Sequence, residues 1–377
     1  MAERREYELG ELLIYEQPTQ YIVNSTDYND TYPIPVLTAG KSFILGYTNE
    51  TDGIFKELPV IIFDDFTTAT QYVNFPFKVK SSAMKILHIN RELVLPKYIY
   101  YRMQTIQFDH STHKRYWIQQ YSKIKVSVPP IPEQERIVAR IEELFSQLDA
   151  GVETLKKTKA QLAVYRHAVL KEAFDSVFGR RLQIEDVCEE IKVGIVIKPT
   201  QYYVDADGVF AFRNANVRRG YIDDHDWVMI SKEGHKKNQK SEVHTGDVLI
   251  SRSGANLGMA SPVSETYDGY NAIDVVIAVP DKTVILPAFL AHYTNSPMGR
   301  SIVKKNERGA AQGHLNVTVY SRLPIVVPSI TEQQAIIDTI EGKISVCDSI
   351  EQTIDIALQQ SEAMRQSILK QAFEGRL

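Results

Sequence analysis

The chain has 377 residues, 44% of them hydrophobic, and a formal net charge of −4. That length suits two or three domains, and the near-neutral charge excludes a protein that is basic over its whole surface. The sequence shows neither a secretory signal nor an apolar run long enough to cross a membrane. Because Cys188 and Cys347 fit no metal or redox spacing, we expect a cytoplasmic protein in a reducing setting.

Residues 1–130 are predicted to form a first globular domain that is rich in strands. Short β-branched apolar runs at 33–37 and 60–63 are bounded by turn residues, a pattern typical of strands. The segment 97–107 follows a proline and has the composition of a helix. Residues 121–128 are predicted to be a last strand that leads into the next segment.

Residues 131–178 are predicted to form one long central helix. Pro129 and Pro130 stop any helix before it, and Pro132 lies where the first turn of a helix tolerates proline. At about 1.5 Å per residue the helix is roughly 60 Å long. Apolar residues recur at every seventh position and form a seam that requires a partner helix. The first set of seam positions consists of Ile141, Leu148, Leu155, Leu162 and Val169. A second, weaker set consists of Ile137, Leu144, Gly151, Thr158 and Tyr165.

The partner helix is predicted at residues 329–377, because the sequence repeats itself at an offset of 199 residues without a gap. The sequence RHAVLKEAF at 166–174 returns as RQSILKQAF at 365–373, and the pair Glu133 and Gln134 returns in the same way. The two helices are therefore expected to pair antiparallel. The expected core of the helix pair consists of Ile137, Ile141, Leu144, Leu148, Leu155, Leu162, Val169, Ile336, Ile340, Ile350, Ile354, Met364 and Ile368.

Residues 179–328 are predicted to form a second globular domain on the plan of the first. An apolar strand within 246–254 ends in a polar turn, as the strand within 59–67 does, and a helix follows Pro287 as one follows Pro96. The domains have diverged, whereas the helices stayed alike, so we expect each domain to be individually specialised. The predicted fold class is α+β, with two domains of mixed α and β structure, two long antiparallel coiled-coil helices and a pseudo-two-fold internal repeat.

Taken together, these features resemble the specificity subunit of Type I restriction–modification enzymes. The features that carry the resemblance are a Glu-Gln pair at the start of a proline-bounded helix, an LKxAF helix ending, the duplication of the whole unit and the GDxLxSRSG turn at 246–254. The resemblance covers the whole chain, although Lys343 and Ser361 interrupt the seam of the second helix. It implies two target recognition domains that each read one half of a split DNA sequence.

The resemblance also implies partners and cofactors. The expected partners are double-stranded DNA, two methyltransferase (modification) subunits and restriction motor–nuclease subunits, without any membrane. The chain itself is expected to be non-catalytic and without a cofactor, with S-adenosylmethionine, ATP and magnesium on the partner subunits. Two rival interpretations are a coiled-coil scaffold whose two domains bind proteins, and a nuclease.

The chemistry-bearing motifs of the sequence are weak. No Walker-type phosphate loop is present, and NSPM at 295–298 lacks the second proline and the aromatic residue of an amino-methyltransferase motif. His110 and His113 have a metal-like spacing but no evident third ligand, so an exposed histidine pair is favoured. Asp64 and Asp65 lack a companion for nuclease work; they can accept a hydrogen bond from cytosine N4 or cap a turn.

Candidate DNA contacts fall into two groups. Basic and hydroxyl side chains of the first domain suit phosphate neutralisation, with a solvated face as the alternative. Arg and Asn of the second domain have the chemistry of base readers, because Arg pairs with guanine and Asn with adenine, whereas turn capping is the alternative. The candidates of the first domain are Lys41, Asp65, Thr67, Lys78, Lys80, Ser81, His113, Lys114 and Arg115. Those of the second domain are Arg213, Asn214, Asn216, Arg218, Arg219, Arg252, Ser253, Asn256, Gln312 and His314.

The acidic excess of the chain lies on the two helices. Residues 131–179 carry 7 basic and 8 acidic side chains, and residues 329–377 carry 4 and 8. The repeat within one chain favours an intramolecular pair over a homodimer. The outward acidic faces are then either docking surfaces for partner subunits or solvated surface.

Overall fold

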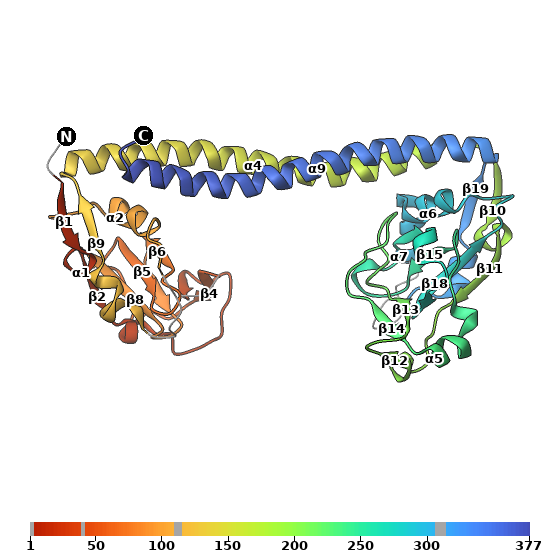
Figure 1. The fold of residues 1–377 in the computed structure, drawn as a ribbon, viewed down its shortest axis with the longest axis horizontal. Helices are drawn as coiled ribbons and strands as arrows, with labels where there is room; N and C mark the ends of the chain where they lie inside the picture. The colour runs from red at the N-terminus through yellow and green to blue at the C-terminus, as the bar shows by residue number, and fades with distance from the viewer. Residues whose placement is uncertain (1–3, 39–41, 109–114, 306–313) are drawn as a thin grey trace. The chain divides into compact units, whose positions relative to one another are not determined.

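The computed structural model describes residues 4–38, 42–108, 115–305 and 314–377 (Figure 1). The chain divides into two compact units, Met1–Leu155 with Ile356–Leu377, and Lys156–Asp355. Each unit contains one globular domain and one end of each long helix. These helices are α4 (Ile131–Asp175) and α9 (Ile330–Phe373).

The domain of the first unit is built on a four-stranded antiparallel sheet with the order β2-β8-β5-β6. The central strand β5 (Val60–Asp64) is buried along its whole length, as a short continuous apolar run predicts. A second sheet has the order β4-β3-β7, in which β3 and β7 run parallel, and β1 pairs with β9. The other strands are β1 (Arg5–Glu8), β2 (Leu13–Glu16), β3 (Ile34–Leu37), β4 (Ile44–Thr48), β6 (Thr70–Val73), β7 (Lys78–Val79), β8 (Met84–Ile89) and β9 (Lys125–Val128).

Short helices cover one side of the main sheet in the first unit. Helix α2 (Pro96–Met103) begins with a proline, which suits the first position of a helix, and buries Tyr98 against Phe373 of α9 at a ring distance of 5.3 Å. Trp117 of α3 (Tyr116–Gln119) packs edge-on against Phe63 of β5. The remaining helical turns are α1 (Leu9–Leu12), η1 (Pro18–Tyr21) and η2 (Tyr121–Lys123).

The domain of the second unit repeats this layout. Its main sheet is antiparallel with the order β11-β18-β15-β16, the strands β13 and β17 run parallel in a sheet of order β12-β14-β13-β17, and β10 pairs with β19. The strands are β10 (Arg180–Gln183), β11 (Cys188–Val193), β12 (Tyr203–Val204), β13 (Val209–Phe212), β14 (Val228–Ile230), β15 (Val248–Ser251), β16 (Ala260–Pro262), β17 (Asn271–Ala272), β18 (Val275–Pro280) and β19 (Pro324–Val327).

The helix α6 (Pro287–Asn295) takes the place that α2 has in the first unit. Its Phe289 packs against Phe174 of α4 at 5.3 Å, as Tyr98 packs against Phe373. The other helical elements are η3 (Ile184–Val187), η4 (Pro199–Tyr202), α5 (Lys232–Lys237), η5 (Gln239–Ser241), η6 (Gly254–Asn256), η7 (Glu265–Tyr267), α7 (Pro297–Lys305) and α8 (Val317–Ser321). The prediction of two domains of mixed α and β structure is confirmed.

The two long helices pair antiparallel within each unit. In the first unit Ile141 and Phe145 of α4 share a buried cluster with Leu369 of α9. In the second unit Val169 of α4 shares a cluster with Ile340 of α9. The start of each helix thus packs against the end of the other, as the repeat predicted.

The predicted core of the helix pair needs one correction. Ile350 and Met364 are 40% and 54% exposed, so their assignment to the core was wrong, and the equivalent positions of α4, Gly151 and Tyr165, are exposed as well. On α4 the second set of inward-facing positions lies one residue after the predicted set, at positions such as Phe145, which follows the predicted Leu144. The other predicted core residues are buried or half-buried: Ile137, Ile141, Leu144, Leu148, Leu155, Leu162, Val169, Ile336, Ile340, Ile354 and Ile368.

Charged residues at inward-facing positions explain the error. Lys159 donates to Asp355 at 2.6 Å, and Arg166 donates to Asp348 and Glu351 at 2.6 Å each. The second set of seam positions can lie three or four residues after the first, and both arrangements repeat every seven positions. The prediction followed apolar content alone and therefore chose the wrong one of these two spacings. Lys343 and Ser361, which interrupt the predicted seam, are half-buried.

Among the residues that the structure describes, none of the helices is both long and apolar enough to span a bilayer.

Candidate nucleic-acid interface

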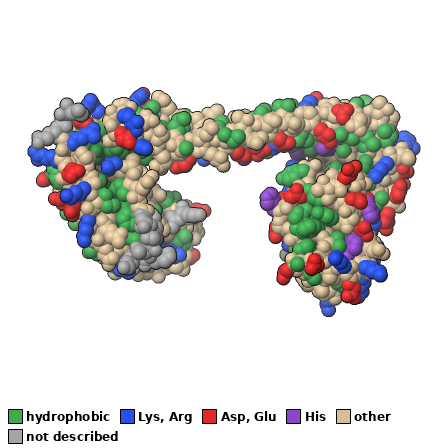
Figure 2. Space-filling view, viewed as in Figure 1, with side chains coloured by type: hydrophobic (Ala, Val, Ile, Leu, Met, Phe, Trp, Pro, Cys, Tyr) green, Lys and Arg blue, Asp and Glu red, His purple; other side chains and the backbone are tan. Residues whose placement is uncertain are grey.

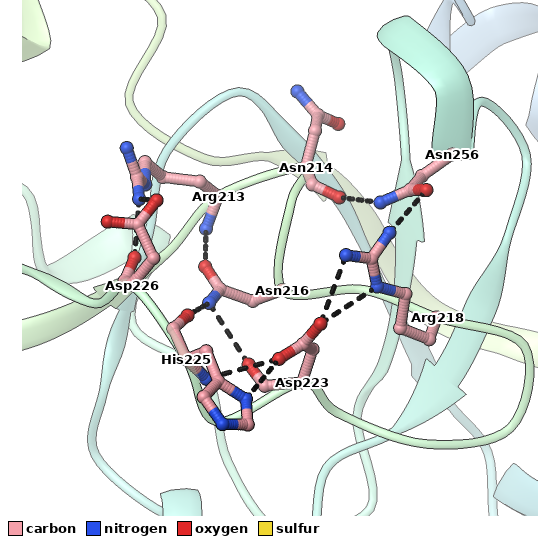
Figure 3. A network of polar contacts seen from close by, with 8 residues as sticks. All are labelled: Arg213, Asn214, Asn216, Arg218, Asp223, His225, Asp226 and Asn256. Carbon is pink, nitrogen blue, oxygen red and sulfur yellow. Dashed lines mark hydrogen bonds and ion pairs between the residues drawn. The ribbon is translucent and has the colours of Figure 1, made fainter. Parts of the chain in front are cut away.

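The predicted base readers of the second domain come together where β13 and β15 end (Figure 3). The side chain of Asn214 connects these strand ends. Its amide oxygen accepts from the backbone N–H of Arg252 at 2.6 Å and from the hydroxyl of Ser251 at 3.0 Å, while its amide nitrogen donates to Ser253 Oγ at 3.0 Å. Asn214 therefore holds the loop after β15 in place through atoms that a base reader would need free.

Asn216 was predicted to contact DNA, and the structure contradicts this. The residue is 0% exposed, its amide oxygen accepts from the Arg213 N–H at 2.9 Å, and its amide nitrogen donates to the carbonyls of Asp223 and His225 at 3.1 Å each (Figure 3). Buried polar groups of this kind stabilise a loop conformation. Asn216 is thus the internal support of the loop between β13 and β14.

Arg218 stabilises the same loop from its other side. Its guanidinium donates to Asp223 Oδ2 at 3.0 and 3.1 Å and to Asn256 Oδ1 at 2.6 Å. Hydrogen bonds from His225 and from Arg218 lower the pKa of Asp223 to about 2, so the carboxylate is charged at neutral pH. Asn256 is 8% exposed, and its amide nitrogen donates to the carbonyl of Asn214, so its prediction as a DNA contact was also wrong.

Two further arginines of this cluster form ion pairs. Arg213 donates to the Asp226 carboxylate at 2.7 Å, and its Nε is buried without a hydrogen-bond partner among the described residues. Arg252 donates to Asp274 at 2.8 Å and to the carbonyl of Leu315 at 3.0 Å. Both guanidinium groups remain partly accessible, whereas Arg219 and His314 are exposed.

Two candidates of the first domain are buried, which contradicts their prediction as DNA contacts. Asp65 is 3% exposed, accepts from the Trp117 N–H at 2.8 Å and lies 3.5 Å from the ammonium of Lys85. Lys78 is 2% exposed and forms an ion pair with Glu50 at 3.0 Å. Because alternating strand residues face opposite sides, a basic residue in a strand pattern can point into the domain.

The remaining candidates of the first domain lie on the surface or outside the described residues. Lys80, Ser81, Thr67 and Arg115 are exposed. Asp64 caps a turn, because its carboxylate accepts from the Phe66 N–H at 2.8 Å, as the alternative interpretation held. The predictions that lie outside the described residues are Lys41, His110, His113, Lys114 and Gln312.

Some residues of this surface carried no readable signal in the sequence. Tyr221 and His225 are 60% and 94% exposed on the loop that Asn216 supports. Such residues are recognisable only when the loop is seen, since exposed Tyr and His are common in any sequence. Among the described residues, no group of three His, Cys, Asp or Glu side chains is arranged to hold a metal ion.

A family model described as the Type I restriction modification DNA specificity domain matches residues 2–163 and 182–360. The chain belongs to this family. The two matched ranges each contain one globular domain and the larger part of the long helix that follows it, in agreement with the internal repeat.

Characterised members of the family align with parts of the chain. The EcoR124I/EcoR124II specificity subunit of Escherichia coli is 48% identical over 174 residues, which are 43% of this chain and 43% of that subunit. The EcoBI specificity subunit of Escherichia coli is 28% identical over 275 residues, 66% of this chain and 58% of that subunit. The chain therefore spans about half of the length of the relatives it matches.

Solved structures share the fold over the whole chain. A chain from a structure of the type I R-M system, reported for its complex assembly and conformational transition, is 17% identical with a TM-score of 0.71 and full coverage of both chains. The HsdS subunit from Thermoanaerobacter tengcongensis is 16% identical with a TM-score of 0.54 and covers 99% of this chain and 97% of that one. At these identities the likeness concerns the fold alone.

Proposed function

We propose that this chain is the sequence-recognition subunit of a Type I restriction–modification complex, in which each domain reads one half of a split DNA target. The observation that carries the proposal is the duplication of a complete unit with one layout and two different polar surfaces. Family membership favours DNA as the ligand over the protein-binding scaffold.

The divergence between the two domains is clearest at one position of the fold. Strand β5 ends at Asp64, which pairs with Met84 of β8, and strand β15 ends at Ser251, which pairs with Val275 of β18. The residues that follow are therefore equivalent: an aspartate, Asp65, in the first domain and an arginine, Arg252, in the second. The Asp65 carboxylate is buried, whereas the Arg252 guanidinium remains partly accessible, so the two domains present different chemistry at this position of a shared scaffold.

The exposed polar residues of the two domains fit two kinds of DNA contact. Lys80 and Arg115 of the first domain and Arg219 of the second are exposed cations suited to phosphate oxygens, which supply affinity without sequence information. Arg213 and Arg252 present guanidinium groups that can reach a guanine edge once their carboxylate partners release them. Affinity and specificity would then come from different residues.

We further propose that the chain is not an enzyme. In this proposal two methyltransferase subunits carry S-adenosylmethionine, and restriction motor–nuclease subunits carry ATP and magnesium, all in the cytoplasm. The support is the family match together with the lack of a catalytic motif in the sequence.

Methylation mapping of a reconstituted complex tests the proposal. The chain is combined with a methyltransferase subunit of a Type I restriction–modification system, and modified adenines are located by single-molecule sequencing of treated DNA. The expected result is a split motif. Exchanging residues 4–128 for the corresponding domain of another family member should change one half of that motif only.

The purified chain alone, incubated with S-adenosylmethionine and magnesium, is the control and should neither methylate nor cut DNA. Turnover that survives rigorous removal of partner subunits would show that the chain is catalytic. A continuous motif, or a domain exchange that alters both halves, would contradict the assignment of one half-site to each domain.

A further inference from the structure

Arg213 and Asp226 form an ion pair at one end of the polar network of the second domain (Figure 3). The Nη2 of Arg213 donates to Oδ2 of Asp226 at 2.7 Å and to the backbone carbonyl of the same residue. The loop that carries both residues does not need this pair for its conformation. Buried Asn216 already joins the Arg213 N–H to the carbonyls of Asp223 and His225. The pair is therefore available for another role.

Two features indicate that Arg213 gains by moving to a ligand. Its Nε is buried without a hydrogen-bond partner among the described residues, and an unpaired buried donor costs free energy. The Asp226 side chain is 83% exposed, so water screens the ion pair and the pair contributes little to stability. The guanidinium therefore loses little when it leaves Asp226 for a group that offers more acceptors.

The neighbouring ion pair of Arg252 and Asp274 is held more firmly. The Nε of Arg252 donates to the carbonyl of Leu315 at 3.0 Å, and its Nη1 donates to Asp274 at 2.8 Å. Asp274 also accepts from the amide nitrogen of Asn214 at 3.3 Å. These bonds join separate segments of the domain, and both side chains are less than one-third exposed. Exchange of the carboxylate for a ligand is therefore easier for Arg213 than for Arg252.

Opening the ion pair leaves two groups of opposite hydrogen-bonding character. The guanidinium of Arg213 only donates, and the carboxylate of Asp226 only accepts. In the major groove of DNA, guanine presents two acceptors, O6 and N7, and cytosine presents one donor, N4. A G·C base pair can thus satisfy both side chains at once. An A·T pair offers a guanidinium one acceptor on each base instead of two on one base.

The spacing of the two side chains matches the edge of a G·C pair. Nη2 of Arg213 and Oδ2 of Asp226 lie 2.7 Å apart. Guanine O6 and cytosine N4 are hydrogen-bonded to each other within the base pair, so they lie about 2.9–3.0 Å apart. A donor beside an acceptor on the protein then faces an acceptor beside a donor on the DNA. The side chains need to move little to exchange partners.

We propose that Arg213 and Asp226 together read one G·C base pair of the half-site that the second domain recognises. Arg213 donates to O6 and N7 of the guanine, and Asp226 accepts from N4 of the paired cytosine. The inference rests on the proposed function and deepens it, because it names a base pair of the half-site and a carboxylate as a second reader. A base pair that turns an acceptor toward Asp226 leaves its charge unpaired and is penalised.

Binding measurements on a substituted half-site test the proposal. The full-length chain is combined with a methyltransferase subunit of a Type I restriction–modification system, and methylation mapping with the domain exchange described above identifies the second half-site. Each base pair of this half-site is then substituted in turn. The parent complex should prefer G·C at one position by roughly 5- to 150-fold. Arg213→Ala and Asp226→Asn should each lower the preference at that same position severalfold and leave the other positions unchanged.

A base analogue tests the Arg213 contact without any change to the protein. The analogue 7-deazaguanine lacks the N7 acceptor but keeps its pairing with cytosine. It replaces one guanine of the second half-site at a time. We expect binding of the parent complex to weaken severalfold at the guanine of the proposed base pair, and the Arg213→Ala complex to be insensitive there. This arm decides the guanine contact even if a variant fails to fold.

Exposed carboxylates recur over the domain of the second unit, and two of them supply matched controls (Figure 2). Asp224→Asn removes the same charge two residues from Asp226. Asp207→Asn removes it at a residue that, like Asp226, has a positive φ, at 55° and 59° respectively. Asparagine tolerates this backbone conformation as aspartate does. Both controls should keep the preference at every position, and all variants with asparagine should show the unfolding midpoint of the parent chain.

Three results would overturn the inference. One is an Asp226→Asn complex that binds all DNA more tightly without a change of base preference, since Asp226 then only withholds Arg213. The others are a parent complex insensitive to 7-deazaguanine at every position, and a second half-site without a G·C pair. Each of these leaves the proposed function intact if the parent complex marks a split motif. A parent complex without any sequence preference removes the proposed function itself.

Discussion

Gln134 and Gln333 hold the two long helices to their domains through identical sets of three hydrogen bonds. The amide oxygen of Gln134 accepts from the N–H of Leu95 at 2.8 Å, and that of Gln333 accepts from the N–H of Leu286 at 2.8 Å. Each amide nitrogen donates to two backbone carbonyls, one ahead of the domain helix and one ahead of the long helix. Both side chains are 0% exposed, so each joins two helix starts inside the domain.

The first prediction concerns the stability of this joint. Gln333→Leu keeps the volume but leaves one buried N–H and two buried carbonyls without partners. Each unpaired buried group costs about 1–3 kcal/mol, so we expect the free energy of unfolding to fall by at least about 2 kcal/mol. Urea denaturation monitored by circular dichroism measures the change.

Gln334→Leu is the control, because Gln334 is an exposed neighbour that bonds Asp338 within the helix. It should stay within about 0.5 kcal/mol of the parent chain. Equal effects of the two substitutions would show that the buried amide of Gln333 does not secure the helix start.

The repeated Glu-Gln pair was visible in the sequence, but its role was not. Repetition at 199 residues marks Gln134 and Gln333 as constrained positions, and the proline before each helix predicts where the helix begins. The acceptors of the two amides are backbone carbonyls, which any sequence supplies. Hydrogen bonds from a side chain to backbone groups 39 to 49 residues away therefore cannot be recognised from residue identity.

The second prediction separates affinity from specificity in DNA recognition. Arg213→Ala should relax the preference for one base pair at a cost of about 1–3 kcal/mol if the contact is bidentate. Lys80→Ala removes an exposed cation and should weaken binding to all sequences. The slope of the logarithm of the binding constant against the logarithm of the salt concentration should become shallower by about the amount that one phosphate contact contributes. Binding of the reconstituted complex to a library of half-site variants, at several salt concentrations, measures both.

Asn216→Ala serves as the structural comparison for this experiment. Because Asn216 is buried and supports the loop, its loss should lower stability and weaken every base preference of the second domain together. An unchanged base preference with Arg213→Ala would remove that residue from the readers.

The third prediction concerns pH. His292 lies 3.6 Å from Glu341, and burial lowers the pKa of His292, although Glu341 partly opposes this. In the unfolded chain the pKa of histidine is about 6.5. Below that pH the unfolded chain takes up a proton that His292 resists in the fold, so this contribution to stability is complete above pH ~6.5 and is lost as the pH falls.

The residues of the other repeat supply the variants for this test. Tyr101 takes the place of His292 in the first unit, so His292→Tyr should reduce the fall in the unfolding midpoint between pH 7 and pH 5. His167→Gln, which replaces an exposed histidine by the residue of the other copy, should leave that fall unchanged. If His292→Tyr keeps the pH dependence of the parent chain, another group is responsible.

The polar cluster of the second domain shows what composition predicts and what it leaves open. Arg213, Asn214 and Arg252 were grouped from residue type, and the structure does bring them together at the ends of β13 and β15. Which member faces inward depends on loop conformation: Asn216 is buried three residues from the half-buried Arg213. Asn and Arg suit a base edge and a backbone carbonyl equally well, so their identity does not decide between the two.

The last prediction concerns exchange of the two halves. Residues 1–178 alone contain one domain and all of α4, and two copies can pair antiparallel through their apolar seam. Fully buried large side chains contribute roughly 1.5–3 kcal/mol each, which in sum opposes the entropy lost on association. Arg166 would then face Asp149 of the other copy, as Arg365 faces Asp149 in the parent chain. We expect a two-fold symmetric dimer.

This dimer should pack less well than the parent helix pair at one defined place. Lys159 donates to Asp355 at 2.6 Å and lies 3.5 Å from Glu351 in the parent chain. The repeat puts Lys156 and Val152 of the other copy in those two positions, so Lys159 meets a second lysine instead of two carboxylates. Like charges at that distance weaken association.

Lys156→Asp in the fragment supplies the carboxylate that Asp355 provides in the parent chain. We expect it to tighten the dimer severalfold, since two equivalent ion pairs form across the symmetry axis, and to do so less at high salt. Lys157→Asp, with the same change of charge on the neighbouring residue, should tighten it far less. Light scattering and sedimentation equilibrium measure the dissociation constants.

With the methyltransferase subunit, the dimer should mark an inverted repeat of the half-site read by the first domain. A monomeric fragment, or a complex that still marks the asymmetric target, would mean that the two halves are not interchangeable. In that case the charges along the helix pair allow the helix of each half to pair only with the helix of the other half.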